Sequence, residues 1–489
     1  MPLPIKPKPM IPTGSTWFDD FCLVPFIWRA SPPPLAPSHG AAVYLCIVFQ
    51  RAAWQTLFSA GFGDCRPYPW TGPAAPVIRP LCQPGSGLKV NTRDGWAWAC
   101  APFPQRRCGG AWNMASNTLT DQTRSQQAQG SAASGARLVS LDAFRGFTMF
   151  WIVGGKSLMM AFRNLDANVI AATVAYQLTH SPWEGIRFYD VIWPAFMLMV
   201  GVSVPFSFAR RRQTHTVWQI RLQALKRSVV LFLLGSLRVS VSTNTPTLIE
   251  LSSALQPIAV AYLVASFLAN ASRRVQAAVG VLILLAYGLA LHFISAPGVQ
   301  AGSYALENNL VRAVDLWTIG RTHPEGWGTV LSTLPTISTT ILGLLLGQVL
   351  MSGASPRRKA AVIGITGLAC VLAGLALSLV VPVIMKLWTV SYGVLSAGWA
   401  CLQFFLFFWI IDVWGWKKWA FPFVVIGMNA ITIYLGVTLV PITRIVGIFS
   451  KPLAAQMGAF GPLFSALAVI LVEWLILYWM YKRKIFLRA

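Results

Sequence analysis

Charged residues are scarce in this sequence, and acidic residues are the scarcest. Charged side chains make up 11% of the 489 residues, whereas a soluble domain typically has about 25%. Lysine and arginine outnumber aspartate and glutamate by 39 to 15, which gives a net charge of +24. Hydrophobic residues reach 55%, and apolar runs of about 20 residues recur along the chain. This balance excludes an ordinary soluble protein and predicts a helical membrane protein.

Patterns that mark several kinds of soluble enzyme are also absent from the sequence. We find no glycine-rich phosphate loop, no zinc-ligand spacing and no Gly-x-Ser-x-Gly turn. No bound metal is therefore expected. The basic residues fall in short clusters between apolar runs, as they do in the cytoplasmic loops of membrane proteins, so nucleic acid is not an expected partner.

Cysteine is nearly absent beyond residue 113. Six of the eight cysteines precede Met114. Residues 1–113 also hold 18 of the 32 prolines and no glutamate, and they show no helical or alternating period. Two explanations stay open for this extension: a start codon assigned too far upstream, or a disordered Pro-rich segment. Residues 114–137 are polar and rich in Ser, Gln and Ala, so we expect a cytoplasmic tail there.

From residue 138 onward the apolar runs predict an all-α polytopic bundle of about ten spans. The expected spans are 141–160, 188–208, 225–243, 252–270, 276–296, 329–350, 360–380, 391–411, 420–440 and 461–481. The connections after even-numbered spans are basic, and those after odd-numbered spans carry few basic residues. Because lysine and arginine mark the cytoplasmic side, both termini are expected there, and residues 138–485 form a multi-pass domain of the inner (plasma) membrane.

Ionisable and aromatic residues gather on the expected non-cytoplasmic side. The stretch "LTHSPWEGIRFYD" (178–190) brings His180, Trp183 and Asp190 to the mouth of the second span. Ionisable groups within membrane segments are costly and usually face a cavity or a partner. An imidazole titrates near neutrality and suits proton transfer, and Asp190 is a candidate to orient it.

The order of the motifs carries a family resemblance. The segments, in chain order, are "RLVSLDAFRGFTMFWIVGG" (137–155), the His-x-x-Trp element at 180–183, the Asp-Val-Ile-Trp-Pro element at 190–194, "HPEGWGTVLSTLPTISTTILGLLLG" (323–347), "KLWTVSYGVLS" (386–396) and "GMNAITIYL" (427–435). This set resembles the heparan-α-glucosaminide N-acetyltransferase-like family of polytopic membrane acyltransferases, in its bacterial type.

The resemblance implies acetyl transfer from cytosolic acetyl-CoA to an amino sugar or glycan on the far side of the membrane. It implies that His180 is the active-site histidine, acting as a base or as a transient acetyl carrier. The sequence departs from the family at Lys156, where the lysosomal branch has an asparagine, and at His323, where the family has an aspartate. Both positions belong to the acceptor side, so the acceptor stays open.

Further candidates have two interpretations each. Asp142 and Arg145 either pair on one helix face or help to hold CoA. Lys156 either extends its ammonium group to the interface or contacts the acceptor. Asn429 is either a cavity donor or an interhelical hydrogen bond. Trp183 either stacks on a sugar ring or belongs to the interfacial aromatic residues.

The partners expected are the bilayer, the acceptor, for which Glu325 is a further binding candidate, and a second copy of the chain in a homodimer. Two other function classes remain: a membrane transporter, which broken helices with midplane polar groups would favour, and a membrane scaffold without chemistry. The scaffold would leave the ionisable cluster around His180 unexplained.

Overall fold

The structure, a computed structural model, describes residues 138–165, 168–251 and 254–487. The expectations for the extension 1–113 and the tail 114–137 therefore lie outside the described residues. Within the described ranges the chain is all-helical, and its only β-pairing consists of isolated bridges. The predicted helical membrane bundle is confirmed at this level.

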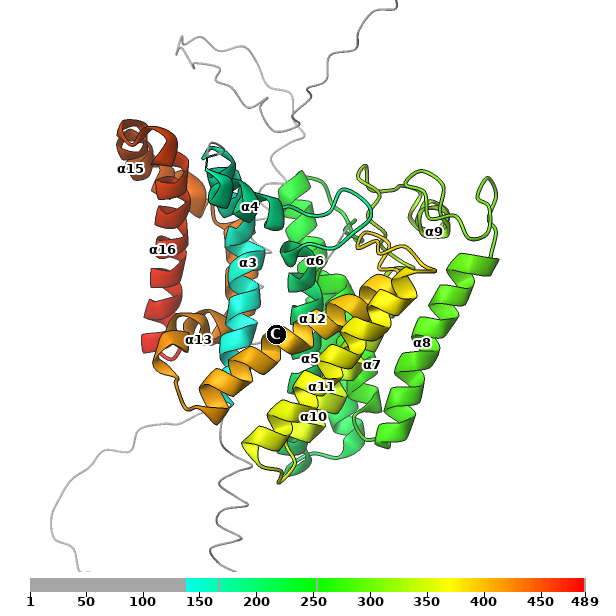
Figure 1. Ribbon diagram of the computed structural model, residues 1–489. Helices are drawn as coiled ribbons and strands as arrows, with labels where there is room; N and C mark the ends of the chain where they lie inside the picture. Colours follow the sequence, from blue (N-terminus) through cyan, green and yellow to red (C-terminus); the bar gives the residue numbers. More distant parts are fainter. Residues whose placement is uncertain (1–137, 166–167, 252–253, 488–489) are drawn as a thin grey trace, which may run out of the picture. The chain divides into compact units, whose positions relative to one another are not determined.

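Long helices run along the bundle and short helices lie at one end of it (Figure 1). The helices that run along the bundle are α3 (Val139–Arg163), α5 (Phe188–Arg212), α6 (Val217–Thr243), α7 (Leu255–Leu268), α8 (Arg273–Phe293), α10 (Thr333–Leu350), α11 (Pro356–Ser378), α12 (Val390–Phe408) and α16 (Gly461–Lys482). Two shorter helices, α13 (Phe421–Met428) and α14 (Ala430–Leu439), form one bent pair. The short helices are α4 (Val169–Gln177), α9 (Leu310–Ile319) and α15 (Ile442–Gln456). We call the end that carries α4, α9 and α15 the loop-rich end.

Each of the ten expected spans falls on a helix or on a broken helix pair, but not all pass as membrane spans. In the described part of the chain, six helices are long and apolar enough to cross a membrane, or seven if the bent pair α13 and α14 is one span. The remaining three expected spans correspond to α3, α6 and α7. Several charged side chains lie along α3 and α6, and α7 has 14 residues, fewer than the roughly 20 that a straight span needs.

The expected span 420–440 is the clearest departure from a straight helix. Its two halves, α13 and α14, are bent by 62° at Asn429. Asn429 has φ −124° and ψ 36°, outside the helical region, and its side-chain amide donates to the carbonyl oxygen of Ile485 at 3.2 Å. The buried side-chain amide thus has a hydrogen-bond partner at Ile485, beyond α16.

Glycines allow the central helices to approach closely. A β-carbon built on Gly201 of α5 would lie 1.9 Å from the carbonyl oxygen of Thr340 on α10. One built on Gly146 of α3 would lie 1.7 Å from the carbonyl oxygen of Phe423 on α13. Only glycine fits at either contact, which is the small-residue packing typical of membrane helices.

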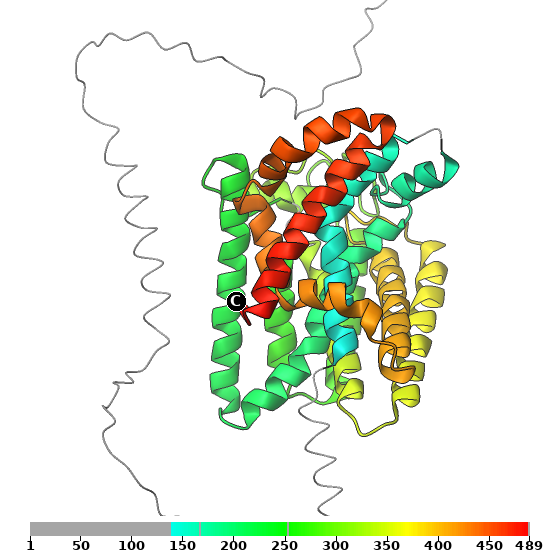
Figure 2. The same ribbon diagram turned by 90° about the vertical axis from the view of Figure 1, so that its left-hand side faces the viewer.

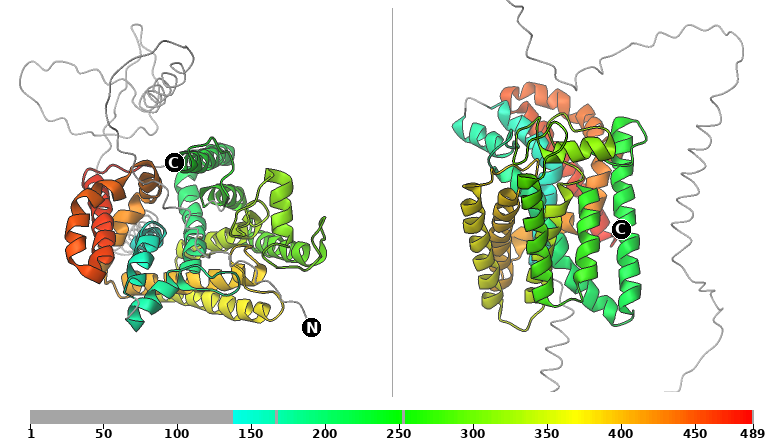
Figure 3. Two further views of the ribbon diagram at one scale, coloured as in Figure 1. Left: turned by 90° about the horizontal axis from the view of Figure 1, so that it is seen from above. Right: turned by 90° about the vertical axis from the view of Figure 1, so that its right-hand side faces the viewer.

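The packing partners follow from these contacts. Helix α5 packs on α10 and α12, and α3 packs on α13, α5 and α16, as Figure 2 shows for α3 and α16. Helices α8 and α16 lie on opposite sides of the bundle (Figure 3). The adjacent helices α3 and α5 lie between them, and the connection from α3 to α5 crosses the loop-rich end through α4.

Candidate active site

Connections from three parts of the sequence meet at the loop-rich end. They are 178–187 before α5, 323–330 before α10 and 382–389 before α12. The amide of Gly185 donates to the carbonyl oxygen of Val383 at 2.8 Å, and the amide of Gly328 donates to that of Lys386 at 2.9 Å. Backbone hydrogen bonds therefore fix the three connections to one another.

The start of helix α5 places Asp190. Arg187 is the N-cap residue, and Asp190 is the third residue of the helix. The Asp190 carboxylate accepts from the backbone amide of Arg187 at 2.8 Å and from that of Ser181 at 3.3 Å. An acidic residue in a first helical turn satisfies otherwise unpaired amides and favours the helix dipole. These two hydrogen bonds explain how the carboxylate of Asp190 can be fully buried, independently of any catalytic role.

The second role of Asp190 is its contact with His180. The Nδ1 of His180 lies 2.7 Å from Oδ1 of Asp190. A carboxylate can only accept a hydrogen bond, so Nδ1 carries the proton and donates it. In the neutral ring the lone pair then resides on Nε2, which makes no hydrogen bond to any residue that the structure describes. The two residues expected to be catalytic are therefore brought together, with His180 in the tautomer that a general base requires.

Aromatic rings hold the imidazole from two sides. The ring of His180 lies 4.7 Å from that of Tyr189 and 5.2 Å from that of Trp327 in an edge-on contact. The hydroxyl of Tyr392, on α12, donates to the backbone carbonyl of Asp190 at 2.6 Å. His180 keeps 35% of its side-chain surface exposed while Asp190 has none. The imidazole is thus fixed in orientation and still open to a substrate.

Lys386 is part of this site, although the sequence did not single it out as a site residue. Its ammonium donates to the backbone carbonyl of Glu325 at 2.9 Å, lies 3.9 Å from the carboxylate of Glu325, and sits 5.8 Å from the ring centre of Trp327. The side chain is only 10% exposed. Burial lowers the pKa of Lys386. The single charged residue in the motif "KLWTVSYG" could have indicated from the sequence that Lys386 is a candidate site residue.

Glu325 lies in the same group, as a candidate for substrate binding requires. Its carboxylate accepts from the indole nitrogen of Trp327 at 3.1 Å. That hydrogen bond, together with the nearby positive charge of Lys386, lowers the pKa of Glu325 below its usual value. The side chain is 68% exposed, so an anionic carboxylate is presented to solvent beside Trp327, the ring that also contacts His180.

His323 stabilises the loop that carries Glu325 by a hydrogen bond within that loop. The backbone amide of Glu325 donates to its Nδ1 at 3.1 Å, and its ring lies 6.4 Å from that of Trp327. Burial lowers the pKa of His323, which favours the neutral ring that can accept that hydrogen bond. His323 thus stabilises the loop that carries Glu325 and Trp327.

Two other expected site residues occupy different surroundings. The indole of Trp183 donates to the carbonyl oxygen of Tyr304 at 3.0 Å and packs with Leu310 and Val311, so it ties the His180 connection to the loop before α9. Lys156 is exposed on α3, about two turns before the helix ends at Arg163.

Asp142, Arg145 and Asn429 belong to a second polar group near the start of α3. Arg145 donates to Asp142 at 2.8 Å and to the carbonyl oxygen of Gly427 at 2.7 Å. Asn429 follows two residues later, at the break between α13 and α14, and its Oδ1 is buried without a hydrogen-bond partner among the described residues. The predicted helix-face pair is present, and it also holds the carbonyl end of α13.

Within the described ranges 138–165, 168–251 and 254–487, no group of three or more His, Cys, Asp or Glu side chains is placed to hold a metal ion. In comparisons with known proteins, the chain matches no protein family and no curated protein.

Proposed function

We propose that this protein is a membrane acyltransferase that moves an acetyl group from cytosolic acetyl-CoA to the amine of an amino sugar or glycan on the opposite side of the membrane. The observation that carries the proposal is the hydrogen bond of 2.7 Å between His180 and the fully buried Asp190, with the imidazole exposed among aromatic rings. The motif resemblance to the heparan-α-glucosaminide N-acetyltransferase-like family supports the same reaction.

The reaction needs an amine that loses its proton as it attacks the thioester carbonyl. Nε2 of His180 accepts that proton, and the buried carboxylate of Asp190 stabilises the imidazolium that forms. The C–N bond forms, the C–S bond breaks, and the proton passes from the imidazolium to the thiolate of CoA. In a two-step variant Nε2 attacks the thioester carbonyl and the C–S bond breaks to release the CoA thiolate; the amine then attacks the acetyl-imidazole, the C–Nε2 bond breaks, and the proton of the amine passes to the thiolate.

Lys386 and Glu325 have complementary roles in this proposal. The largely buried ammonium of Lys386 contacts the same indole ring as His180, so its charge can stabilise the oxyanion of the tetrahedral intermediate. The exposed carboxylate of Glu325 can accept hydrogen bonds from the hydroxyl or ammonium groups of an amino sugar.

The donor is proposed to bind at the other end of α3. Arg145, which pairs with Asp142 in the first turns of this helix, is the proposed contact for the phosphates of CoA. Helix α3 has 25 residues and is about 37 Å long. Its two ends are thus separated by roughly a bilayer core of ~30 Å. We place the loop-rich end outside and both termini in the cytoplasm, with ten spans in the inner (plasma) membrane.

A transporter is the second candidate, and one observation favours it. The span broken by 62° at Asn429 resembles the discontinuous helices that bind substrate in transporters. Such a site would use Asn429 and leave the His180–Asp190 pair without a task. The two candidates therefore differ in which polar group is essential.

The test is acetyl transfer by the purified full-length chain in detergent, with radiolabelled acetyl-CoA and glucosamine. His180→Ala should lower transfer by at least about 10²–10⁴, the usual contribution of a general base. His292→Ala is the matched control, because His292 is exposed at the end of α8 on the loop-rich end. If both variants keep wild-type transfer, the proposed role of His180 is refuted.

A further inference from the structure

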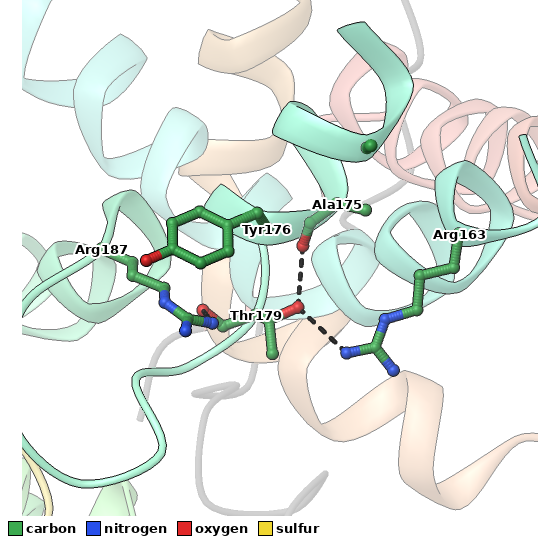
Figure 4. Close-up of a pocket in the computed structure, with 6 residues that line it drawn as sticks. Arg163, Ala175, Tyr176, Thr179 and Arg187 are labelled. Carbon is green, nitrogen blue, oxygen red and sulfur yellow. Dashed lines mark hydrogen bonds between the residues drawn. The ribbon is translucent and has the colours of Figure 1, made fainter. Parts of the chain in front are cut away.

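A cavity of about 280 Å³ lies beside the connection that carries His180. Six residues line it: Arg163, Ala172, Ala175, Tyr176, Thr179 and Arg187. They come from the last turn of α3, from α4 and from the segment before α5. Figure 4 shows the two arginine side chains reaching toward Thr179 from opposite sides.

The charge in this cavity is of one sign. Arg163 and Arg187 supply two guanidinium groups, and no acidic side chain is among the lining residues. Within the described part of the chain neither arginine takes part in an ion pair. Unpaired arginines in a concave site favour an anion that brings its own negative charge.

The contacts of each arginine show how many of its N–H groups are already used in hydrogen bonds. Arg163 donates one hydrogen bond, from Nη2 to the hydroxyl of Thr179 at 3.3 Å. Arg187 uses Nη1 on the carbonyl oxygens of Thr179 and His180, at 3.5 Å and 3.2 Å, and its guanidinium lies 4.0 Å from the ring centre of Tyr176. A guanidinium has about five N–H donors, so both side chains keep donors for a ligand.

One short backbone segment borders both the cavity and the proposed active site. Thr179 lines the cavity and is followed directly by His180, so the two α-carbons are about 3.8 Å apart. Arg187 contacts the backbone carbonyl of His180 itself. An anion bound here would lie against the same short segment that presents the imidazole to the acceptor.

The size of the cavity limits what it can bind. One water molecule occupies about 30 Å³ in the liquid, so 280 Å³ holds a carboxylate, sulfate or phosphate group with the atoms that attach it. We infer that this cavity is an oxyanion subsite for the acyl acceptor, between Arg163 and Arg187, so that acidic amino sugars are preferred over neutral ones. This inference rests on the proposed acetyl transfer for the identity of its ligand, and the binding of the anion itself does not depend on it.

The experiment compares two acceptors that differ by one anionic group, glucosamine and glucosamine 6-phosphate. The wild-type chain should use the phosphorylated sugar at least tenfold better in kcat/KM. Arg163→Gln should reduce that preference to within about threefold. Arg163 is the better position to change because it is exposed and its one hydrogen bond among the described residues, to Thr179, is long at 3.3 Å, so the substitution should leave folding almost unchanged. Arg444→Gln is the control, since Arg444 is exposed on α15 at the same loop-rich end.

A binding measurement separates this inference from the proposed function. Inorganic phosphate should raise the thermal unfolding midpoint of the wild-type chain and of Arg444→Gln, but not that of Arg163→Gln. If neither sugar is acetylated but this pattern of stabilisation is seen, the subsite stands and acetyl transfer falls. If both sugars are acetylated equally and phosphate has no effect, the subsite is refuted while the proposed function survives.

A lipid phosphate is the other source of the same chemistry. Vesicles of phosphatidylcholine with and without phosphatidylglycerol distinguish it, because a lipid site would make the chain depend on the anionic lipid. Loss of that dependence in Arg163→Gln, with no preference between the two sugars in the wild-type chain, would overturn the assignment to the acceptor.

Discussion

Replacing Asp190 with asparagine should abolish transfer while leaving the fold almost intact. The carboxylate of Asp190 receives three hydrogen bonds: Oδ1 from His180, and Oδ2 from the amides of Ser181 and Arg187. An asparagine has one accepting oxygen and one donating NH₂ group. The Oδ2 position accepts two of the three hydrogen bonds and the Oδ1 position accepts one. The asparagine oxygen therefore keeps more of the native hydrogen bonds at the Oδ2 position. The NH₂ group then points at Nδ1 of His180.

That arrangement reverses the tautomer of the imidazole. Nδ1 has to accept the hydrogen bond from the introduced NH₂ group, so the proton moves to Nε2, which can no longer receive one from the amine. We expect kcat to fall by about 10³–10⁴, the range seen when the aspartate of a Ser-His-Asp triad is replaced by asparagine. The loss of stability should be about 1 kcal/mol, because two of the three hydrogen bonds remain.

Asp315→Asn is the matched control. Asp315 is also buried at the loop-rich end, and its two oxygens accept from the amides of Thr329 and Val330, each at 2.8 Å. In Asp315→Asn the introduced NH₂ group must face one of these backbone N–H groups, which leaves that N–H without an acceptor and costs about 1–3 kcal/mol of stability. Asp315→Asn should therefore lose more stability than Asp190→Asn and far less activity. Transfer above a tenth of wild type in a folded Asp190→Asn protein would refute the proposed role of the pair.

Three further perturbations test other parts of the structure. In a chain freed of native cysteines, Ala301→Cys should react with an impermeant thiol reagent added outside intact cells and Ser355→Cys should not; the reverse result would invert the proposed orientation. Lys386→Met should lower kcat/KM for acetyl transfer by about 10²–10³ if its charge stabilises the oxyanion, whereas Lys451→Met, on exposed α15, should match wild type. Burial lowers the pKa of His323 below its unfolded value of about 6.5, so the unfolded chain binds the proton more readily and stability falls as the pH drops below about 6.5. His323→Asn keeps a hydrogen-bond acceptor without titrating, and its thermal midpoint should fall less than that of wild type between pH 7.5 and 5.5; equal falls would contradict this account.

The sequence predicted the local features of the site better than its long-range ones. His180 and Asp190 are ten residues apart, at the entry to a helix, so their proximity follows from one short connection. Lys386 and Trp327 reach the same place from loops far along the chain. Their positions depend on backbone hydrogen bonds between connections, such as that from Gly328 to Lys386, which no local pattern encodes.

The same limit applies to the fold. Apolar runs predicted where helices lie, because burial in lipid or protein demands apolar side chains over a whole helix. They did not predict the bend at Asn429, whose side-chain amide contacts the carbonyl oxygen of Ile485, a residue far away in the sequence. Nor did they predict that α7 is short, because apolar residues that flank a helix lengthen the apolar run without lengthening the helix.

The most direct test of the central claim is the sidedness of acetyl transfer. The full-length chain is reconstituted into sealed vesicles in one orientation, with radiolabelled acetyl-CoA only on the side of Ser355 and glucosamine only on the side of His180. The account predicts N-acetylglucosamine on the His180 side, formed by the wild-type chain and not by His180→Ala. Acetylation that requires both reactants on one side, or transfer that is unchanged in His180→Ala, would contradict it.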